Sequence, residues 1–427
     1  MADAKTLKSR LASGEFDARL KEVYLSDKAV EDQKKRDAVI IDEFVRLFGD
    51  NDSIELFSAP GRTEVGGNHT DHNHGKVLAA SVDLDTVAAA AKRDDGIIVE
   101  KSFKFDALEV DISDLEVHTE EFGKSSGLIR GMCAGFKERG YNIGGFNAAS
   151  MSRVLSGSGL SSSAAYEVLI GTILNHLYND GKVSPVEVAK IAQYAENKYF
   201  GKPCGLLDQT ASSVGSFITI DFKDPSRPII NKVDFDFASC GHALCIIDTG
   251  GNHSDLTDDY AAVRGEMEKA AEVFGKSVLR EVDEDEFMDN ISLVREKVND
   301  RAVLRAMHFY GENRRAEAEV KALEDGDFEK FKELVTESGR SSYMYNQNVF
   351  TSKDVEHQSV SVALAMCEYL LKNKGAWRVH GGGFAGTIQA FVPLDMLDDF
   401  CEKMEAVFSK GSCYVLSVRP FGGIKLF

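Results

Sequence analysis

The chain has 427 residues, of which 43% are hydrophobic and 28% charged, so it can bury a sizeable core. Its 50 Lys and Arg stand against 69 Asp and Glu, and the net charge of -19 argues against nucleic acid as a partner. A chain this acidic must bind any phosphate group locally, through backbone N–H groups or a bound cation.

The seven cysteines are scattered, odd in number and without a CxxC pair. This pattern predicts the reduced thiols of a cytoplasmic protein rather than a disulfide framework or a zinc site. No apolar run approaches the ~18 residues of a membrane span, and the first residues lack the pattern of a signal peptide. We therefore expect a cytoplasmic location and no membrane partner.

The first half of the chain predicts a helical extension followed by mixed elements. Apolar and charged residues recur at helical spacing between Leu20 and Phe48, so residues 1–50 are expected to be helical. Strands are then expected at 86–93, 97–105, 108–112 and 146–155, with a helix at 127–139. Ser184, Pro185 and Glu187 form the start signal of another helix, which runs towards Tyr199.

The second half alternates further strands and helices. Strands are expected at 243–248, 377–380 and 387–392, and helices at 258–274, 301–323, 328–337, 360–371 and 394–408. Because the elements mix without a regular βαβ rhythm, we predict a two-domain α+β fold with mixed sheets. The predicted domains are residues 51–220 and 221–427, after the extension of residues 1–50.

A Gly/Ser-rich loop, SGSGLSSSA at residues 156–164, leads into a predicted helix. Glycines let a backbone approach a ligand closely, and a helix N-terminus favours anions. The serine hydroxyls add donors for phosphate and possible ligands for Mg²⁺. An ordinary loop with a serine N-cap is the alternative. The loop is not a Walker A motif, because no Gly-Lys-Ser/Thr closes it.

Two other segments are rich in chemistry-bearing side chains. The segment GRTEVGGNHTDHN at residues 61–73 can hydrogen-bond several hydroxyls of a polyol. A solvated loop is one alternative, and a metal site formed by His69, Asp71, His72 and His74 is another, although their spacing matches no common ligand pattern. In CGLLDQ, at residues 204–209, Asp208 is either a helix cap or, if paired with Arg62, a candidate base.

Together these segments resemble those of the galactokinases, in the GHMP kinase superfamily, in both order and spacing. The resemblance extends from about Ile54 to the end of the chain. It rests on four segments, namely residues 59–73, 159–164, 204–209 and the glycine motif HGGGFAG at residues 380–386. It implies a GHMP kinase fold with the active site in a cleft between the two domains.

The resemblance also implies a reaction and a set of roles. An ATP-dependent kinase of this family phosphorylates the anomeric hydroxyl of galactose, with Asp208 and Arg62 as the catalytic residues. The implied sugar-binding residues are Asn68, His69, Asp71, Gly205 and Tyr260. The implied ATP-binding residues are Gly157, Ser158, Gly159, Leu160, Ser161, Ser162, Ser163 and Ala164, with Ser163 (or Ser162) and Glu196 as Mg²⁺ ligands. The expected partner is a small sugar, and the expected state is a monomer.

The sugar segment departs from the family pattern at Asn68 and at residues 63–66, where TEVG replaces the usual Val-Asn-Leu-Ile. Asn68 stands where the family has a glutamate that contacts the primary hydroxyl of the hexose, and Glu64 stands where an asparagine is usual. A neutral Asn68 would tolerate a carboxylate, so a kinase for galacturonate is an alternative. A sensor that binds sugar and ATP without catalysis is another, although it would not need the intact Arg62, Asp208 and Glu196.

Overall fold

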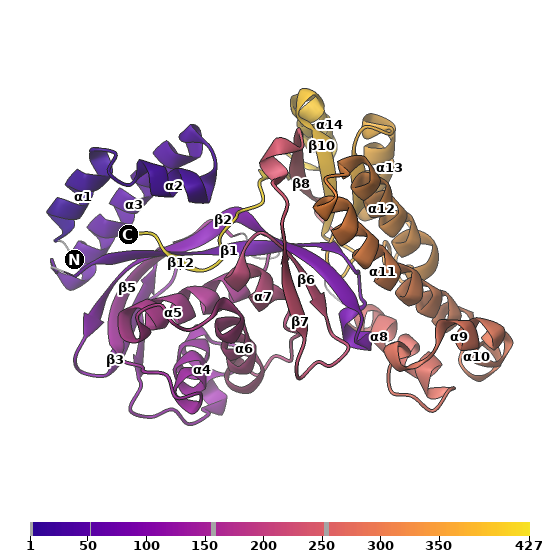
Figure 1. The fold of residues 1–427 in the computed structure, drawn as a ribbon, viewed down its shortest axis with the longest axis horizontal. Coiled ribbons are helices and arrows are strands. Elements are labelled where there is room, and N and C mark those ends of the chain that lie inside the picture. The colour runs from indigo at the N-terminus through magenta and orange to yellow at the C-terminus, as the bar shows by residue number, and fades with distance from the viewer. Residues whose placement is uncertain (1–2, 52, 155–158, 252–255) are drawn as a thin grey trace.

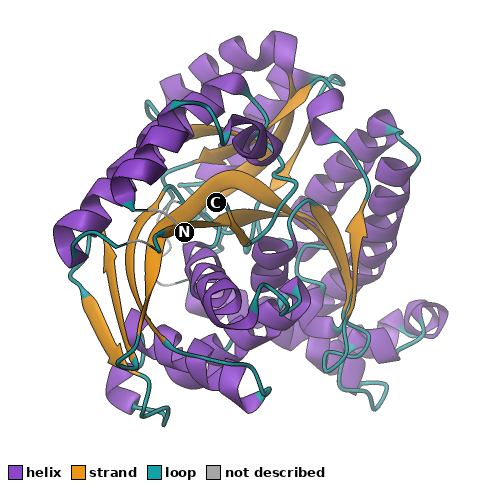
Figure 2. Cartoon of the chain, turned by 60° about the vertical axis from the view of Figure 1, so that its left-hand side comes forward, coloured by secondary structure: helices purple, strands orange, loops and turns teal. Residues whose placement is uncertain are grey.

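The computed structural model describes residues 3–51, 53–154, 159–251 and 256–427. An eight-stranded sheet and a four-stranded sheet, each flanked by helices, form the two halves of the molecule (Figure 1). Figure 2 shows the long strands curving through the middle of the molecule between layers of helices. This arrangement agrees with the predicted α+β class.

The larger sheet has the order β12-β1-β2-β5-β3-β4, with β6 and β7 added beside β2. Its strands are β1 (Glu55–Gly66), β2 (Lys76–Arg93), β3 (Ile97–Ser102), β4 (Leu108–Asp111), β5 (Gly145–Ser152), β6 (Phe217–Asp221), β7 (Ile229–Val233) and β12 (Ile424–Lys425). Strands β3 and β5 pair in parallel, whereas β1 and β2 are antiparallel. Strand β7 follows the predicted boundary after residue 220, and β12 returns from the C-terminal segment, so the proposed domain division remains a prediction.

Helices cover both faces of this sheet (Figure 1). One face carries α4 (Ser125–Glu138), α5 (Ser162–Asn179), α6 (Pro185–Ala195) and α7 (Leu207–Val214), and the other carries α1 (Ala4–Ala12), α2 (Asp17–Tyr24) and α3 (Asp27–Phe48). Successive side chains of a strand point to opposite faces. On β2, Ala88 therefore packs with α4 to α6, and its neighbour Ala89 packs with the N-terminal helices.

A buried ionic network joins the N-terminal extension to the sheet. Asp85 on β2 is paired with Arg36 of α3 and with Arg419, and Tyr24 donates a hydrogen bond to it over 2.6 Å. Burial raises the pKa of Asp85, but the charges of the two arginines outweigh this effect and lower it to about 2. The extension is thus bonded into the interior of the first half.

The second half is built on the smaller sheet. Its order is β11-β8-β10-β9, with β8 (His242–Asp248), β9 (Ala376–Val379), β10 (Thr387–Pro393) and β11 (Cys413–Leu416). The helices of this half are α8 (Thr257–Glu272), α9 (Glu284–Asp289), α10 (Ile291–Lys297), α11 (Asp300–Glu324), α12 (Phe328–Ser341), α13 (Ser359–Leu371) and α14 (Leu397–Phe408). Within the described part of the chain, no helix combines the length and the apolar character needed to cross a membrane.

Candidate active site

Arg62 and Asp208 form the centre of the site. Strand β1 carries Arg62, and the first turn of α7 carries Asp208. The guanidinium binds the carboxylate in bidentate geometry, with Nε 2.6 Å from Oδ1 and Nη2 2.7 Å from Oδ2. Ser161 donates a further hydrogen bond to Oδ2 over 2.7 Å. Three segments that are far apart in the sequence therefore meet at one carboxylate.

The surroundings keep Asp208 ionised. Burial raises its pKa, but the charge of Arg62 and the hydrogen bonds from Arg62 and Ser161 outweigh burial, so the pKa lies below the ordinary value. The side chain remains 34% exposed, so it is not sealed inside the protein. Asp208 is consequently a fixed anion that can accept a hydrogen bond from a bound hydroxyl.

The predicted phosphate loop approaches the same pair. Gly157 and Ser158 lie outside the described residues. The carbonyl of Gly159 accepts a hydrogen bond from Nη1 of Arg62, and the carbonyl of Leu160 accepts one from the backbone N–H of Arg62 over 3.0 Å. Ser161 has a left-handed φ of 57° directly before α5, whose first residues are Ser162, Ser163 and Ala164. The end of the loop is thus bonded to β1.

The turn after β1 is held by residues within and beyond the motif. Gly67 has a φ of +83°, and a Cβ there would lie 2.3 Å from the carbonyl oxygen of Lys76. Thr70 bonds the carbonyls of Gly67 and Lys76 over 2.8 and 2.7 Å. From α11, Oε1 of Glu312 accepts the backbone N–H groups of Gly67 and Asn68 over 3.2 and 3.3 Å. Glu312 is a positioning residue that the sequence motifs did not indicate.

Two of the predicted sugar-binding side chains form hydrogen bonds with backbone carbonyls of the C-terminal glycine motif. Nε2 of His69 lies 2.9 Å from the carbonyl of Gly382, and the hydroxyl of Tyr260 donates to the carbonyl of Gly383 over 3.0 Å. A Cβ at Gly382 would lie 2.6 Å from the ring of Tyr260, so only glycine allows this approach. Burial lowers the pKa of His69, and because a carbonyl only accepts, Nε2 carries the proton.

Asp71 and Gly205 also approach each other. A Cβ on Gly205 would lie 3.3 Å from Oδ2 of Asp71, so the turn after β1 lies against the segment that precedes Asp208. The predicted sugar residues therefore come from both halves of the chain, with Tyr260 on α8 and Gly205 before α7.

Asn68 is held entirely by the protein. Its side chain is buried, at 1% exposure. Nδ2 donates to Oε1 of Glu64 and to the carbonyl of Gly381, each over 2.8 Å, while Oδ1 accepts from Asn348 over 2.9 Å and from Ser342 over 3.3 Å. These bonds use both donors and both lone pairs of the amide. A direct contact between Asn68 and sugar stays a prediction, and it would require one of these bonds to break.

The predicted metal ligand Glu196 lies beside a second buried carboxylate. Gln209 donates to Glu196 over 2.7 Å and to Glu167 of α5 over 3.3 Å. Burial and the charge of Glu196 raise the pKa of Glu167 well above its ordinary value, and no described residue bonds its enclosed Oε1. Glu167 follows Ser163 by four residues, on the same helix face, so the donor set Ser163, Glu167 and Glu196 fits a divalent cation.

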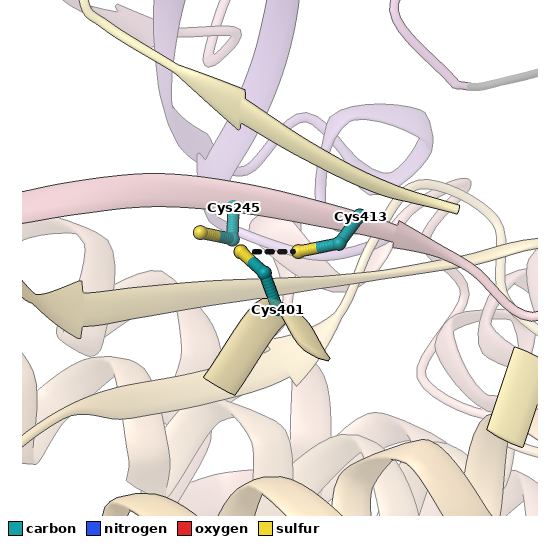
Figure 3. A group of neighbouring side chains, drawn as sticks. All are labelled: Cys245, Cys401 and Cys413. Carbon is teal, nitrogen blue, oxygen red and sulfur yellow. Dashed lines mark hydrogen bonds between the residues drawn. The ribbon is translucent and has the colours of Figure 1, made fainter. Parts of the chain in front are cut away.

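The alternative histidine metal site receives no support from the geometry. Among residues 3–51, 53–154, 159–251 and 256–427, one group of three or more His, Cys, Asp or Glu side chains converges closely enough to hold an ion, and it consists of Cys245, Cys401 and Cys413 (Figure 3). The scattered cysteines of the sequence are therefore partly brought together by the fold.

Comparisons with known proteins show which family the chain resembles. The galactokinase galactose-binding signature matches residues 42–92, and the GHMP kinases N terminal domain matches residues 127–216. The galactokinase of Clostridium beijerinckii is 30% identical over 396 residues, which are 89% of this chain and 97% of that protein. The galactokinase of Glaesserella parasuis serovar 5 is 32% identical over 364 residues, or 83% of this chain and 89% of that protein.

Solved structures show the same architecture. Lactococcus lactis galactokinase complexed with galactose has a TM-score of 0.75 at 27% identity, over 91% of this chain and 99% of that chain. Methanococcus jannaschii mevalonate kinase, at 13% identity and a TM-score of 0.61 over 86% of this chain and 98% of that chain, shares the fold. The chain is a GHMP kinase in fold and belongs to the galactokinase family.

Proposed function

We propose that the protein transfers the γ-phosphoryl group of ATP to the anomeric hydroxyl of galactose and forms galactose 1-phosphate. The observation that carries this proposal is the bidentate Arg62–Asp208 pair, which Ser161 completes at the meeting point of three motifs. The curated galactokinases that match most of the chain support the choice of sugar.

The proposed chemistry depends on position and charge. Phosphoryl transfer requires little covalent work from the protein, so alignment and charge stabilisation dominate. Asp208 accepts or orients the proton of the sugar hydroxyl. Arg62 keeps Asp208 ionised and stabilises negative charge on the transferring phosphoryl group.

ATP would bind at the N-terminus of α5. The loop residues Gly157 to Ala164 would offer backbone N–H groups and hydroxyls to the phosphates, where the helix dipole also favours anions. Ser163, Glu167 and Glu196 would hold Mg²⁺. When bound, the ion neutralises charge on the ATP phosphates.

The sugar would lie between the two halves of the chain. The groups that would bind its hydroxyls are the side chains of His69, Asp71 and Tyr260 and the backbone of Gly205. Asn68 would hold the neighbouring side chain of Glu64 and the backbone at Gly381 in place. A monomer in the cytoplasm remains our expectation for the protein as a whole.

The test is ATP consumption by the purified protein with Mg²⁺ against galactose, galacturonate, glucose, N-acetylgalactosamine and arabinose. We expect galactose to be the fastest substrate. Faster turnover of an acidic sugar would keep the mechanism and change the substrate. No turnover with any sugar would contradict the kinase proposal and favour a binding protein.

A further inference from the structure

Glu64 lies in the candidate sugar site, although no role was predicted for it. On β1, Arg62 and Glu64 are partly exposed and alternate with the buried Thr63 and Val65. Because alternate side chains of a strand share a face, Glu64 points to the same side of the sheet as the catalytic Arg62. Its carboxylate interacts electrostatically with both Arg62 and His69. It therefore lies close enough to the reaction centre and to a predicted sugar residue for its charge to act on both.

The carboxylate is fixed through one oxygen only. Oε1 accepts hydrogen bonds from Asn68 over 2.8 Å and from the buried Arg378 over 2.7 Å. Arg378 is itself held by the carbonyls of Val65 and Val379. Oε2 accepts no hydrogen bond from the described residues and is not enclosed, and the side chain is 15% exposed. Glu64 thus presents a rigidly oriented acceptor with one free oxygen.

We propose that Oε2 of Glu64 accepts a hydrogen bond from a sugar hydroxyl and selects neutral sugars over uronic acids. This inference rests on the proposed function. The charged acceptor strengthens the bond to a hydroxyl and repels a substrate carboxylate. Asn68 is a positioning residue, because its amide holds Oε1 and leaves Oε2 free. Relative to the usual galactokinase pattern the carboxylate and the amide have exchanged positions, and in this chain they are hydrogen-bonded to each other.

Because the carboxylate has moved to Glu64, the neutral Asn68 is no longer a reason to expect galacturonate as the substrate. A neutral Asn68 alone would tolerate a substrate carboxylate, but Glu64 returns a negative charge to the same site, 2.8 Å from the amide of Asn68. A uronic acid would therefore meet like charge rather than a neutral amide.

The test is Glu64→Gln, which keeps the length of the side chain and an acceptor oxygen for Arg378. Because a hydrogen bond to a charged group is stronger than one to a neutral group, KM for galactose should rise about 10- to 100-fold while KM for ATP stays unchanged. The ratio of galacturonate to galactose turnover should rise. The matched control is Glu55→Gln on the same strand, which pairs with Lys425 and should leave both KM values unchanged.

Deoxygalactoses separate a sugar contact from a general structural effect. If Glu64 binds one hydroxyl, the penalty of Glu64→Gln should vanish for the analogue that lacks that hydroxyl and persist for the others. An unchanged KM for galactose, or the same penalty with every analogue, would overturn the inference. Failure of the wild type to phosphorylate galactose would instead contradict the proposed function. In that case, calorimetric measurement of sugar binding to the wild type and to Glu64→Gln would still test the role of Glu64.

A separate observation concerns the three converging cysteines. Cys245 comes from β8, Cys401 from α14 and Cys413 from β11, and their sulfur atoms all lie within 4.8 Å of one another. Figure 3 shows Sγ of Cys401 between the other two sulfurs, 3.3 Å from that of Cys413. Cys245 is buried, while Cys401 and Cys413 are partly exposed, so a small ion could reach the cluster.

We infer that this cluster binds a thiophilic metal ion such as Zn²⁺. Thiolates are preferred ligands of zinc, with Zn–S distances of about 2.3 Å, and three sulfurs this close can surround one ion. A water molecule would complete a tetrahedral site, and the thiols would release their protons on binding. The cluster belongs to the core beneath the smaller sheet, and this inference is independent of sugar phosphorylation.

Competition with a chromophoric chelator measures the binding of Zn²⁺ to the intact protein. We expect one equivalent to bind and the thermal midpoint to rise with it. Cys401→Ser should abolish this binding, and Cys413→Ser should do the same. Cys240→Ser, which lies outside the cluster, should retain it. Absence of binding in the wild type, or equal binding by Cys401→Ser, would refute the assignment.

Discussion

Asp85 and Asp208 are both carboxylates held by arginine, but their surroundings differ. The Asp85 side chain is 1% exposed and is bonded by Arg36, Arg419, Tyr24 and Ser58. The Asp208 side chain is 34% exposed and is bonded by one arginine and one serine. An enclosed carboxylate bonded by four side chains stabilises the fold, whereas one with an exposed side can act on a ligand.

The variant Asp208→Asn tests the catalytic side of this comparison and has the largest expected effect. The amide keeps the size of the side chain but cannot accept a proton, so kcat should fall about 10²- to 10⁴-fold, with a smaller effect on sugar binding. Steady-state kinetics and equilibrium sugar binding measure the two effects. Near-normal turnover would remove Asp208 from the mechanism.

Asp85→Asn should show the opposite pattern. Removing one partner of a buried ion pair leaves arginine charge without compensation, so the free energy of unfolding should fall by about 3–5 kcal/mol in urea titrations. The folded fraction should retain its kcat. A loss of kcat without a loss of stability would mean that Asp85 belongs to the active site.

Acid titration sharpens the same prediction. The pKa of Asp85 is about 2 in the folded chain, against an ordinary value of 3.8. Its stabilising effect is therefore present above pH 3.8 and is lost as the pH falls towards 2. The Asp85→Asn variant should lack this part of the acid transition.

Asp37, in the same helix as Arg36, predicts a pH dependence of opposite sign. Burial raises its pKa from 3.8 to about 8, so the folded state holds a proton that the unfolded state releases between these values. Stability should therefore decline as the pH rises from 4 to 8. Asp37→Asn should remove this decline and stabilise the protein at pH 8 by at least about 1 kcal/mol. An unchanged pH dependence would contradict the role of Asp37.

Features that depend on neighbouring residues could be predicted from the sequence. Ser184 caps α6 as expected, with its hydroxyl accepting the N–H of Glu187 over 3.2 Å, because a cap depends on neighbouring residues. Its partner in the expected capping box, Glu187, instead pairs with Arg139 over 2.8 Å. The contact between Arg62 and Asp208 was anticipated from two motifs, since each contributes one charge.

Long-range partners could not be predicted in this way. Glu312 lies on a long helix with many charged residues, and nothing local shows that its carboxylate caps the turn at Gly67. The spacing between Ser163 and Glu167 offered a usable signal, because a four-residue step shares a helix face. The short helices α9 and α10 contain too few apolar residues to display a period.

The C-terminal strand has a consequence for folding during synthesis. The carbonyl of Phe427 accepts the N–H of Leu56 over 3.0 Å, and its ring stacks on Phe16 at 3.9 Å. Until residues 424–427 leave the ribosome, the β1 edge of the first sheet lacks the partner strand β12 and is open to wrong pairing. At ribosomal rates the stretch between β7 and β12 takes roughly 10–40 s to make. The half that is synthesised first therefore cannot complete its sheet until β12 is made, and the nascent chain is exposed to chaperones during that interval.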